Sequence, residues 1–201
     1  MGLISRTTTF VRYSVEGELP ENFWEFAAER IAQYSFRDID DTFDEYSIGW
    51  VAVDNMFDSA FAHASYAVGD QLVLSLRVDE RKVSNTLLKK YTLKEEERIK
   101  KEHRAPRLSR GHRMQIKEDI RLQLLKKALP VPAVYDLSWN LATNTLLFFS
   151  TSTKAQSLLE DFFKDCFGLT LILQVPYLVA ANLLNPREQE KLKELKPEIL
   201  V

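Results

Sequence analysis

Residues 81–127 read RKVSNTLLKKYTLKEEERIKKEHRAPRLSRGHRMQIKEDIRLQLLKK. The parts of the chain that precede and follow this stretch must be arranged around it. It contains 16 of the 27 lysines and arginines but only 6 of the 29 acidic residues, so its net charge is +10. Residues 1–80 carry 5 basic and 15 acidic side chains, for −10, and residues 128–201 carry 6 and 8, for −2. The overall net charge of −2 therefore hides a strongly polarised chain. Such asymmetry between segments is typical of proteins that bind a polyanion.

The same stretch has the apolar spacing of helices. A short first piece is predicted at residues 87–91. The segment Thr92-Leu93-Lys94-Glu95 has the spacing of a capping box, which predicts a second helix from there to about Arg104. Ser109 is expected to cap a third helix that ends near Ala128, because the prolines that follow cannot continue it.

Two parallel stripes are predicted on the third helix, since residues four apart lie on one helical face. The apolar stripe comprises Ile116, Ile120 and Leu124. The basic stripe runs parallel to it, displaced by roughly one residue in sequence, and comprises Arg113, Lys117 and Arg121. One face of this helix is therefore expected to pack, while the flank beside it stays cationic.

The basic side chains of this stretch are the main candidates for binding a ligand. Contacts from lysine and arginine to phosphates bind DNA without reading its sequence. The alternative is a solvated helical pair whose charges keep the protein soluble, with Glu95, Glu96 and Glu97 as partners for nearby lysines. The candidate nucleic-acid-binding residues are Lys89, Lys90, Lys100, Lys101, Arg104, Arg107, Arg110, Arg113, Lys117, Arg121, Lys126 and Lys127.

The remainder of the chain alternates between strand and helix patterns. Strands are predicted at residues 5–15, 48–53, 71–78, 133–139, 145–151 and 169–175, and helices from Pro20 to Ile31, from Ser152 to Gly168 and from Asn185 onward. This order predicts an α+β protein with antiparallel sheets, packed helices and a basic helical insertion or arm. The predicted parts are an N-terminal α+β part at 1–80, the arm at 81–128 and a C-terminal ββαβ part with a terminal helix at 129–201. One continuous α+β domain with the arm inserted is the alternative.

Few residues have the pattern of a catalytic or metal site. The carboxylates of residues 38–45 could hold a divalent cation in principle, but they lack the glycine and the spacing of an EF-hand loop. His63, His103 and His112 are far apart in sequence, and Cys166 lies on a helix rich in Phe and Leu, where a buried small hydrophobe is expected. We therefore predict no catalytic residue, no metal site and no cofactor.

Several short segments stand in a recognisable order over residues 1–175. They are Ile48-Gly49-Trp50-Val51, the strand Leu72–Arg77, the lysine-rich helices that follow, Leu129-Pro130 with Trp139, Ser152-Thr153-Lys154-Ala155, and Phe167-Gly168-Leu169. Their order and spacing resemble the RdgC family of bacterial recombination-associated DNA-binding proteins, with this chain as a short member that lacks the usual C-terminal third. The resemblance implies a non-enzymatic protein that forms ring-shaped dimers, passes duplex DNA through a basic central hole and restrains RecA-promoted strand exchange.

The leading prediction is a sequence-nonspecific DNA-binding protein of recombination or nucleoid maintenance, cytoplasmic and nucleoid-associated. Its expected partners are double-stranded DNA and a second copy of the chain, with functional antagonism of RecA; binding to single-stranded DNA is left open. No membrane partner is expected, because the most apolar run, Leu169–Leu184, is short and interrupted. Two other classes stay open: a metal-dependent nuclease that uses the carboxylates of 38–45, and a protein-interaction module whose basic helices meet an acidic partner.

Overall fold

A computed structural model describes residues 2–103 and 107–194 of the 201-residue chain. The described residues form two compact units. Unit 1 draws on the ranges Met1–Tyr34, Val51–Leu76 and Tyr135–Val201, and unit 2 on the ranges Ser35–Trp50 and Arg77–Val134. The chain therefore passes between the units several times, and each unit is built from segments far apart in sequence.

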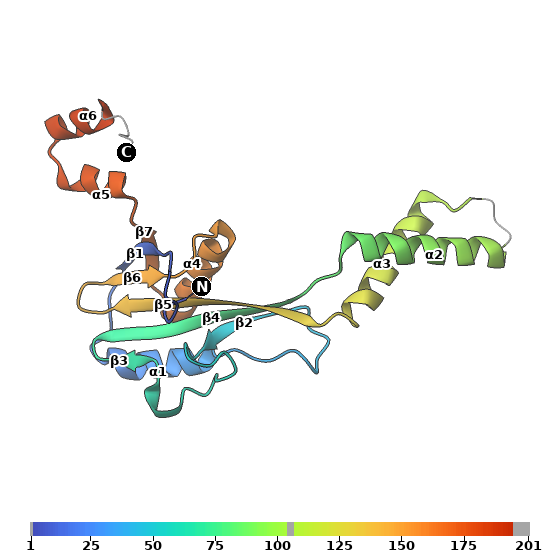
Figure 1. The fold of residues 1–201 in the computed structure, drawn as a ribbon, viewed down its shortest axis with the longest axis horizontal. Helices are drawn as coiled ribbons and strands as arrows, with labels where there is room; N and C mark the ends of the chain where they lie inside the picture. The colour runs from blue at the N-terminus through green and yellow to red at the C-terminus, as the bar shows by residue number, and fades with distance from the viewer. Residues whose placement is uncertain (1, 104–106, 195–201) are drawn as a thin grey trace. The chain divides into compact units, whose positions relative to one another are not determined.

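The described residues form one sheet of seven strands in the order β2–β4–β5–β6–β1–β7, with β3 paired to β4 (Figure 1). The strands are β1 (Val11–Glu16), β2 (Tyr46–Val51), β3 (Ala67–Val68), β4 (Gln71–Arg81), β5 (Pro130–Asn140), β6 (Thr145–Phe148) and β7 (Thr170–Leu173). The helices are α1 (Phe23–Gln33), α2 (Asn85–His103), α3 (Arg110–Leu125), α4 (Thr153–Phe167), α5 (Pro176–Leu183) and α6 (Pro186–Glu194), with a 3-10 turn, η1, at Ala62–Ala64. The predicted α+β class is confirmed.

In unit 1, β1 lies between β6 and β7 and pairs antiparallel with both. The hairpin of β5 and β6 pairs Leu137 with Phe148 and Trp139 with Leu146, and all four side chains are fully buried. The same face of the sheet receives α1 and α4. Phe23 of α1 and Phe163 of α4 both contact the Trp139 ring, with centroids 5.1 and 5.3 Å away. This aromatic cluster is the centre of the unit 1 core, because edge-to-face rings combine large apolar burial with favourable geometry.

Both ends of α4 were correctly predicted from local signals. The Ser152 hydroxyl accepts a hydrogen bond from the Ala155 amide, and Gly168 ends the helix in the left-handed conformation that glycine adopts without strain. A contact from another helix also stabilises the C-terminal end of α4. Arg30 of α1 donates hydrogen bonds to the carbonyls of Asp165, at 2.7 Å, and Cys166. A cation at the end of a helix satisfies its free carbonyls and complements its dipole.

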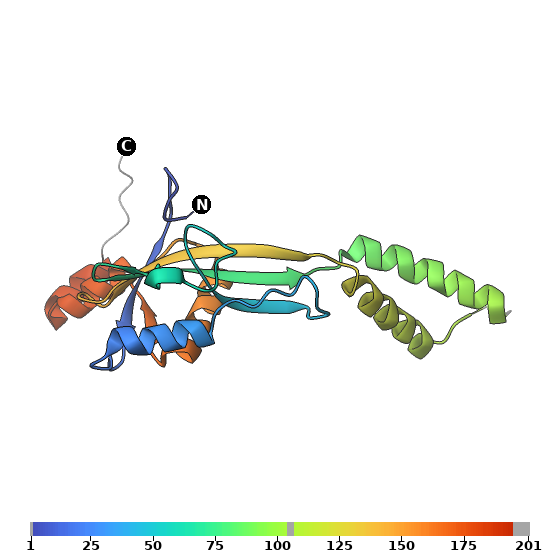
Figure 2. The ribbon, with the colours of Figure 1, turned by 90° about the horizontal axis from the view of Figure 1, so that it is seen from below.

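In unit 2, the helical pair α2–α3 is inserted between β4 and β5, and the two helices pack side by side (Figures 1 and 2). We call residues 81–128 the arm. Its own small core consists of Leu88, Leu108, Ile116 and Ile120, with Val83, Ile99 and Leu124 packed around them. The predicted apolar stripe of α3 is therefore the face that meets α2. Ser109 caps α3 as predicted, since its hydroxyl accepts from the His112 amide at 3.2 Å.

Two local predictions were wrong, and one helix was missed. The helix expected to restart at Thr92 does not, because α2 runs without a break from Asn85 to His103 and Thr92 is an interior residue. The first strand begins at Val11 and not near residue 5. The segment after β7 forms the helix α5, which was not predicted, because an apolar run of this length fits either a strand or a helix.

Candidate nucleic-acid interface

The arm presents its cations outward because its two helices bury their apolar faces against each other. On α3, Ile116 and Ile120 are 4% and 9% exposed, whereas Arg113, Lys117 and Arg121 are all exposed. A side chain one residue along a helix is turned by about 100°, so the basic stripe flanks the packed stripe. The core of the arm thus sets the direction in which its charges point.

Eleven of the twelve candidate residues are described, and Arg104 lies outside the described residues. Ten of the eleven are exposed, and Lys100 is partly buried. Two are paired with carboxylates along their own helix, Lys100 with Glu97 at 3.1 Å and Arg121 with Glu118 at 3.2 Å. The other nine make no ion pair with any described residue: Lys89, Lys90, Lys101, Arg107, Arg110, Arg113, Lys117, Lys126 and Lys127.

The carboxylates of α2 neutralise a cation outside the candidate set. Arg98 lies between Glu95 and Glu102, with nitrogen–oxygen distances of 2.6 and 2.8 Å. The hydrogen bonds from Arg98 lower the pKa of Glu95. The glutamates expected as partners for lysines are therefore largely occupied by Arg98 and Lys100. Most of the positive charge of the arm consequently remains available to an external anion.

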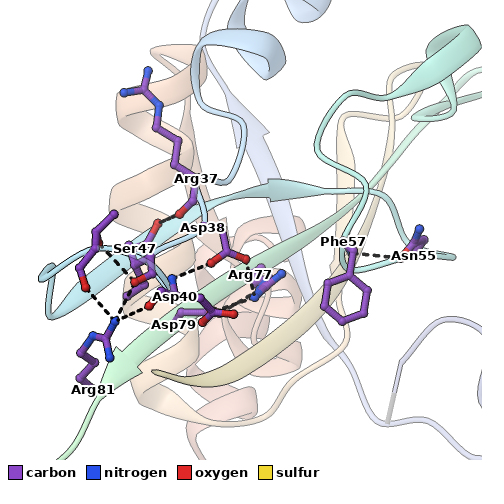
Figure 3. Close-up of polar contacts among 11 residues, drawn as sticks. Arg37, Asp38, Asp40, Ser47, Asn55, Phe57, Arg77, Asp79 and Arg81 are labelled. Carbon is purple, nitrogen blue, oxygen red and sulfur yellow. Dashed lines mark hydrogen bonds and ion pairs between the residues drawn. The ribbon is translucent and has the colours of Figure 1, made fainter. Parts of the chain in front are cut away.

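Arg81 has a different role from the other basic residues of the arm. Its side chain is buried, and its guanidinium donates to five main-chain carbonyls, among them that of Asp40 (Figure 3). Four belong to the loop before β2: Ile39 at 2.7 Å, Asp40 at 3.2 Å, Thr42 at 3.0 Å and Asp44 at 3.0 Å. The fifth is Ala128, just after α3. Sequence analysis missed this function, because main-chain acceptors leave no trace in residue identity.

A second buried arginine holds the start of the same loop. Arg77 forms a two-pronged contact with Asp79, at 2.9 and 2.7 Å (Figure 3). Its guanidinium also stacks over the Phe36 ring, 4.2 Å from the ring centroid. Asp38 approaches Arg77 at 3.8 Å, and the hydrogen bonds with Asp79 raise the pKa of Arg77. Both members of the Arg77–Asp79 pair are nearly inaccessible to water. Such a pair is a structural contact and is not available to a ligand.

The loop itself lies against β2 and against the end of the arm. The amide of Phe36 donates to the Trp50 carbonyl at 2.9 Å, and a side chain at Gly49 would collide with the main chain of Phe36. Glycine is required at this close approach. Farther along the loop, the Lys126 ammonium lies over the exposed ring of Phe43, 5.6 Å from the ring centroid. An acidic loop and the base of a cationic helical pair are therefore neighbours within unit 2.

The carboxylates of residues 38–45 do not converge on one point. Asp38 accepts from the Asp40 amide at 2.7 Å, and Asp44 accepts from the Thr42 hydroxyl at 3.0 Å. Over residues 2–103 and 107–194, no group of three or more His, Cys, Asp or Glu side chains could hold a metal ion.

None of the described helices is long and apolar enough to cross a membrane.

Comparison with known proteins assigns the chain to a family. A family model described as "Putative exonuclease, RdgC" matches residues 11–179, which is most of the 201 residues. A comparison with curated proteins finds no match. The matched range contains all seven strands of the described sheet, the arm, α1 and α4. The resemblance that the order of short segments indicated is thus confirmed, and the chain belongs to the RdgC family.

Proposed function

We propose that this chain is a sequence-nonspecific DNA-binding protein associated with recombination, which restrains RecA-type strand exchange by occupying or encircling DNA. The observation that carries the proposal is the set of nine exposed cations on the arm that have no carboxylate partner among the described residues. Family membership supports it. We also propose that the arm, residues 81–128, acts as the DNA-binding part and that residues 1–80 and 129–201 form the α+β frame from which it emerges.

The mechanism needs only electrostatics and excluded volume. Lysine and arginine side chains that neutralise phosphates release condensed counterions, and this release drives binding to any sequence. Contacts from these cations to phosphates position the duplex without reading its sequence. A protein bound in this way blocks other proteins from the same stretch of DNA. The proposal contains no catalytic step.

The test is a titration of labelled random duplex DNA at low salt, followed by fluorescence anisotropy, with magnesium in one series and a chelator in the other. Equal binding in both series, with the DNA intact on a denaturing gel, is the expected result. Shortened DNA in the magnesium series would favour a nuclease, the activity that the description of the family model names. No binding at low salt in either series would favour a module that meets an acidic protein.

Encirclement further requires self-association. A single cationic surface contacts one side of a duplex, whereas two copies facing each other could surround it. We therefore propose a homodimer related by a two-fold axis, the commonest symmetry of soluble oligomers. Sedimentation velocity at micromolar protein, with and without DNA, measures this directly. A monomer in both conditions would leave binding to one side of the duplex as the mode of action.

A further inference from the structure

A groove of 370 Å³ lies where α2 and α3 pack together, lined by Asn85, Leu88, Lys89, Thr92, Leu93 and Lys117. We propose that this groove binds one unpaired nucleotide of a DNA strand, with the phosphate between Lys89 and Lys117 and the base and sugar against Leu88 and Leu93. The proposal rests on the proposed function, because it assigns one chemical form of DNA to one place on the arm. It distinguishes this place from the other cations of the arm, which contact any phosphate.

The charge around the groove favours an anion. Lys89 comes from α2 and Lys117 from α3, so two different helices each contribute a lysine to the groove lining. No aspartate or glutamate is among the lining residues. Glu118, which follows Lys117 in sequence, binds Arg121 at 3.2 Å, and neither groove lysine makes an ion pair with a described residue. Two uncompensated lysines on one small cavity create a local positive potential that a phosphate would neutralise.

The apolar part of the lining selects among anions. Of the two lining leucines, Leu88 is 9% exposed and belongs to the core of the arm, whereas Leu93 is 51% exposed. Small-ligand sites occupy about 300–1,000 Å³ and combine apolar walls with a few polar groups, as this groove does. A base-paired nucleotide or a free phosphate would cover only the lysines. An unpaired nucleotide also covers the leucines, because its base and sugar are free to leave the stack.

Thr92 gives a second, independent indication. Its hydroxyl oxygen is buried and finds no hydrogen-bond partner among the described residues. Such groups are rare in native structures, and each calls for a physical explanation. Threonine populates two side-chain rotamers within a helix, so a rotation can turn the hydroxyl from its buried position toward the groove. A bound phosphate would then supply the missing partner.

The test compares two ligands and two matched variants by fluorescence anisotropy. The first ligand is a labelled oligothymidylate of about 10 nucleotides, which stays unpaired. The second is a blunt-ended duplex hairpin in which a chemical linker replaces the closing loop, so that it contains no unpaired nucleotide. The first variant is Lys89→Gln with Lys117→Gln. The second is Lys94→Gln with Lys101→Gln, which removes the same charge from exposed positions of α2 outside the groove lining.

Both variants are expected to weaken duplex binding by similar factors, because both remove two charges. The groove variant is expected to weaken oligothymidylate binding about tenfold more than the control variant does. Equal losses on oligothymidylate would overturn the groove site while leaving the proposed function intact. Failure of the wild-type protein to bind either ligand would instead overturn the proposed function.

A third variant, Thr92→Val, keeps the shape of the side chain and removes only the hydroxyl. It is expected to weaken oligothymidylate binding several-fold, to leave duplex binding unchanged and to unfold at a temperature no lower than that of the wild type. Unchanged oligothymidylate binding by a folded Thr92→Val protein would remove the hydroxyl from the site.

Discussion

Arg81 donates a hydrogen bond to the main-chain carbonyl of Ala128, which lies three residues beyond the end of α3. The same guanidinium binds the carbonyls of the loop from Ile39 to Asp44. One side chain therefore ties the acidic loop, the end of β4 and the return of the chain from the arm to one another. Within unit 2, the position at which α3 leads back into the sheet depends on this residue.

Replacing Arg81 by Met is expected to destabilise the protein by more than about 3 kcal/mol, since each buried acceptor left without a partner costs about 1–3 kcal/mol. Denaturant unfolding measures the loss. The control is Lys82→Met at the next position, where the side chain is exposed and forms a surface ion pair with Glu80; this change should cost less than about 1 kcal/mol. Similar losses for the two variants would contradict this structural role of the Arg81 side chain.

The basic stripe of α3 is expected to contribute directly to the salt dependence of DNA binding. Each phosphate contact adds about 0.9 to the slope of log affinity against log salt, so replacing Arg113, Lys117 and Arg121 by Gln should lower that slope by up to about 2.7. All sequences should be weakened alike. Glutamine keeps helix propensity, so the arm should remain folded. A control with Lys154 and Lys164 of α4 replaced by Gln should keep the wild-type slope. An unchanged slope in the triple variant would remove the stripe from the interface.

The acidic loop is expected to oppose DNA binding and not to cut DNA. Asp40 and Asp44 are exposed in the loop that Arg81 holds beside the base of the arm. Changing both to Asn should leave DNA affinity unchanged or raise it by up to about fivefold, which corresponds to about 1 kcal/mol. Asparagine keeps an acceptor oxygen for the Thr42 hydroxyl, so the loop should keep its conformation.

The matched control for the acidic loop is Asp161→Asn with Asp165→Asn, an equal change of charge on exposed positions of α4. Its effect on affinity should be smaller. Magnesium-dependent cleavage by the wild type that disappears in the Asp40 and Asp44 variant would establish the nuclease instead.

A pH effect is expected from Tyr13, which is fully buried and donates to Glu160 at 3.0 Å. Burial, and then the hydrogen bond to Glu160, raises the pKa of Tyr13. The folded protein therefore holds this proton more tightly than the unfolded chain, so the stabilisation is complete below the ordinary phenol pKa of about 10 and is lost as pH rises above it.

Tyr13→Phe should accordingly be less stable than the wild type by about 1 kcal/mol near neutral pH, through loss of the hydrogen bond. The gap should narrow or reverse above about pH 10, where only the wild type has a phenol to ionise. Denaturant unfolding at a neutral and an alkaline pH measures both differences. Tyr177→Phe, at a half-exposed position of α5, is the control for removal of a tyrosine hydroxyl and should cost less stability than Tyr13→Phe near neutral pH. A constant gap for Tyr13→Phe would contradict the assignment.

Local chemistry explains which parts of the fold were predictable. The helix α4 could be placed from Ser152 and Gly168, because capping and a left-handed termination are interactions between residues a few positions apart. The two stripes of α3 could be predicted for the same reason, because the four-residue spacing of Ile116 and Ile120 determines which face of the helix packs. The sequence did not reveal that α2 continues through Thr92, because a threonine whose hydroxyl can cap a helix can also lie in the interior of one.

The amino-acid sequence by itself determined the α+β class, the place of the basic insertion, its net charge of +10 and the apolar face that pairs its two helices. Each of these depends on composition or on spacing within one segment. Only the tertiary structure decided which cations remain available. It buries Arg81 against main-chain carbonyls and Arg77 against Asp79, and it brings Lys89 and Lys117 from separate helices to one groove. A charge count treats all four alike, whereas burial and distance between segments determine whether a cation stabilises the fold or faces a ligand.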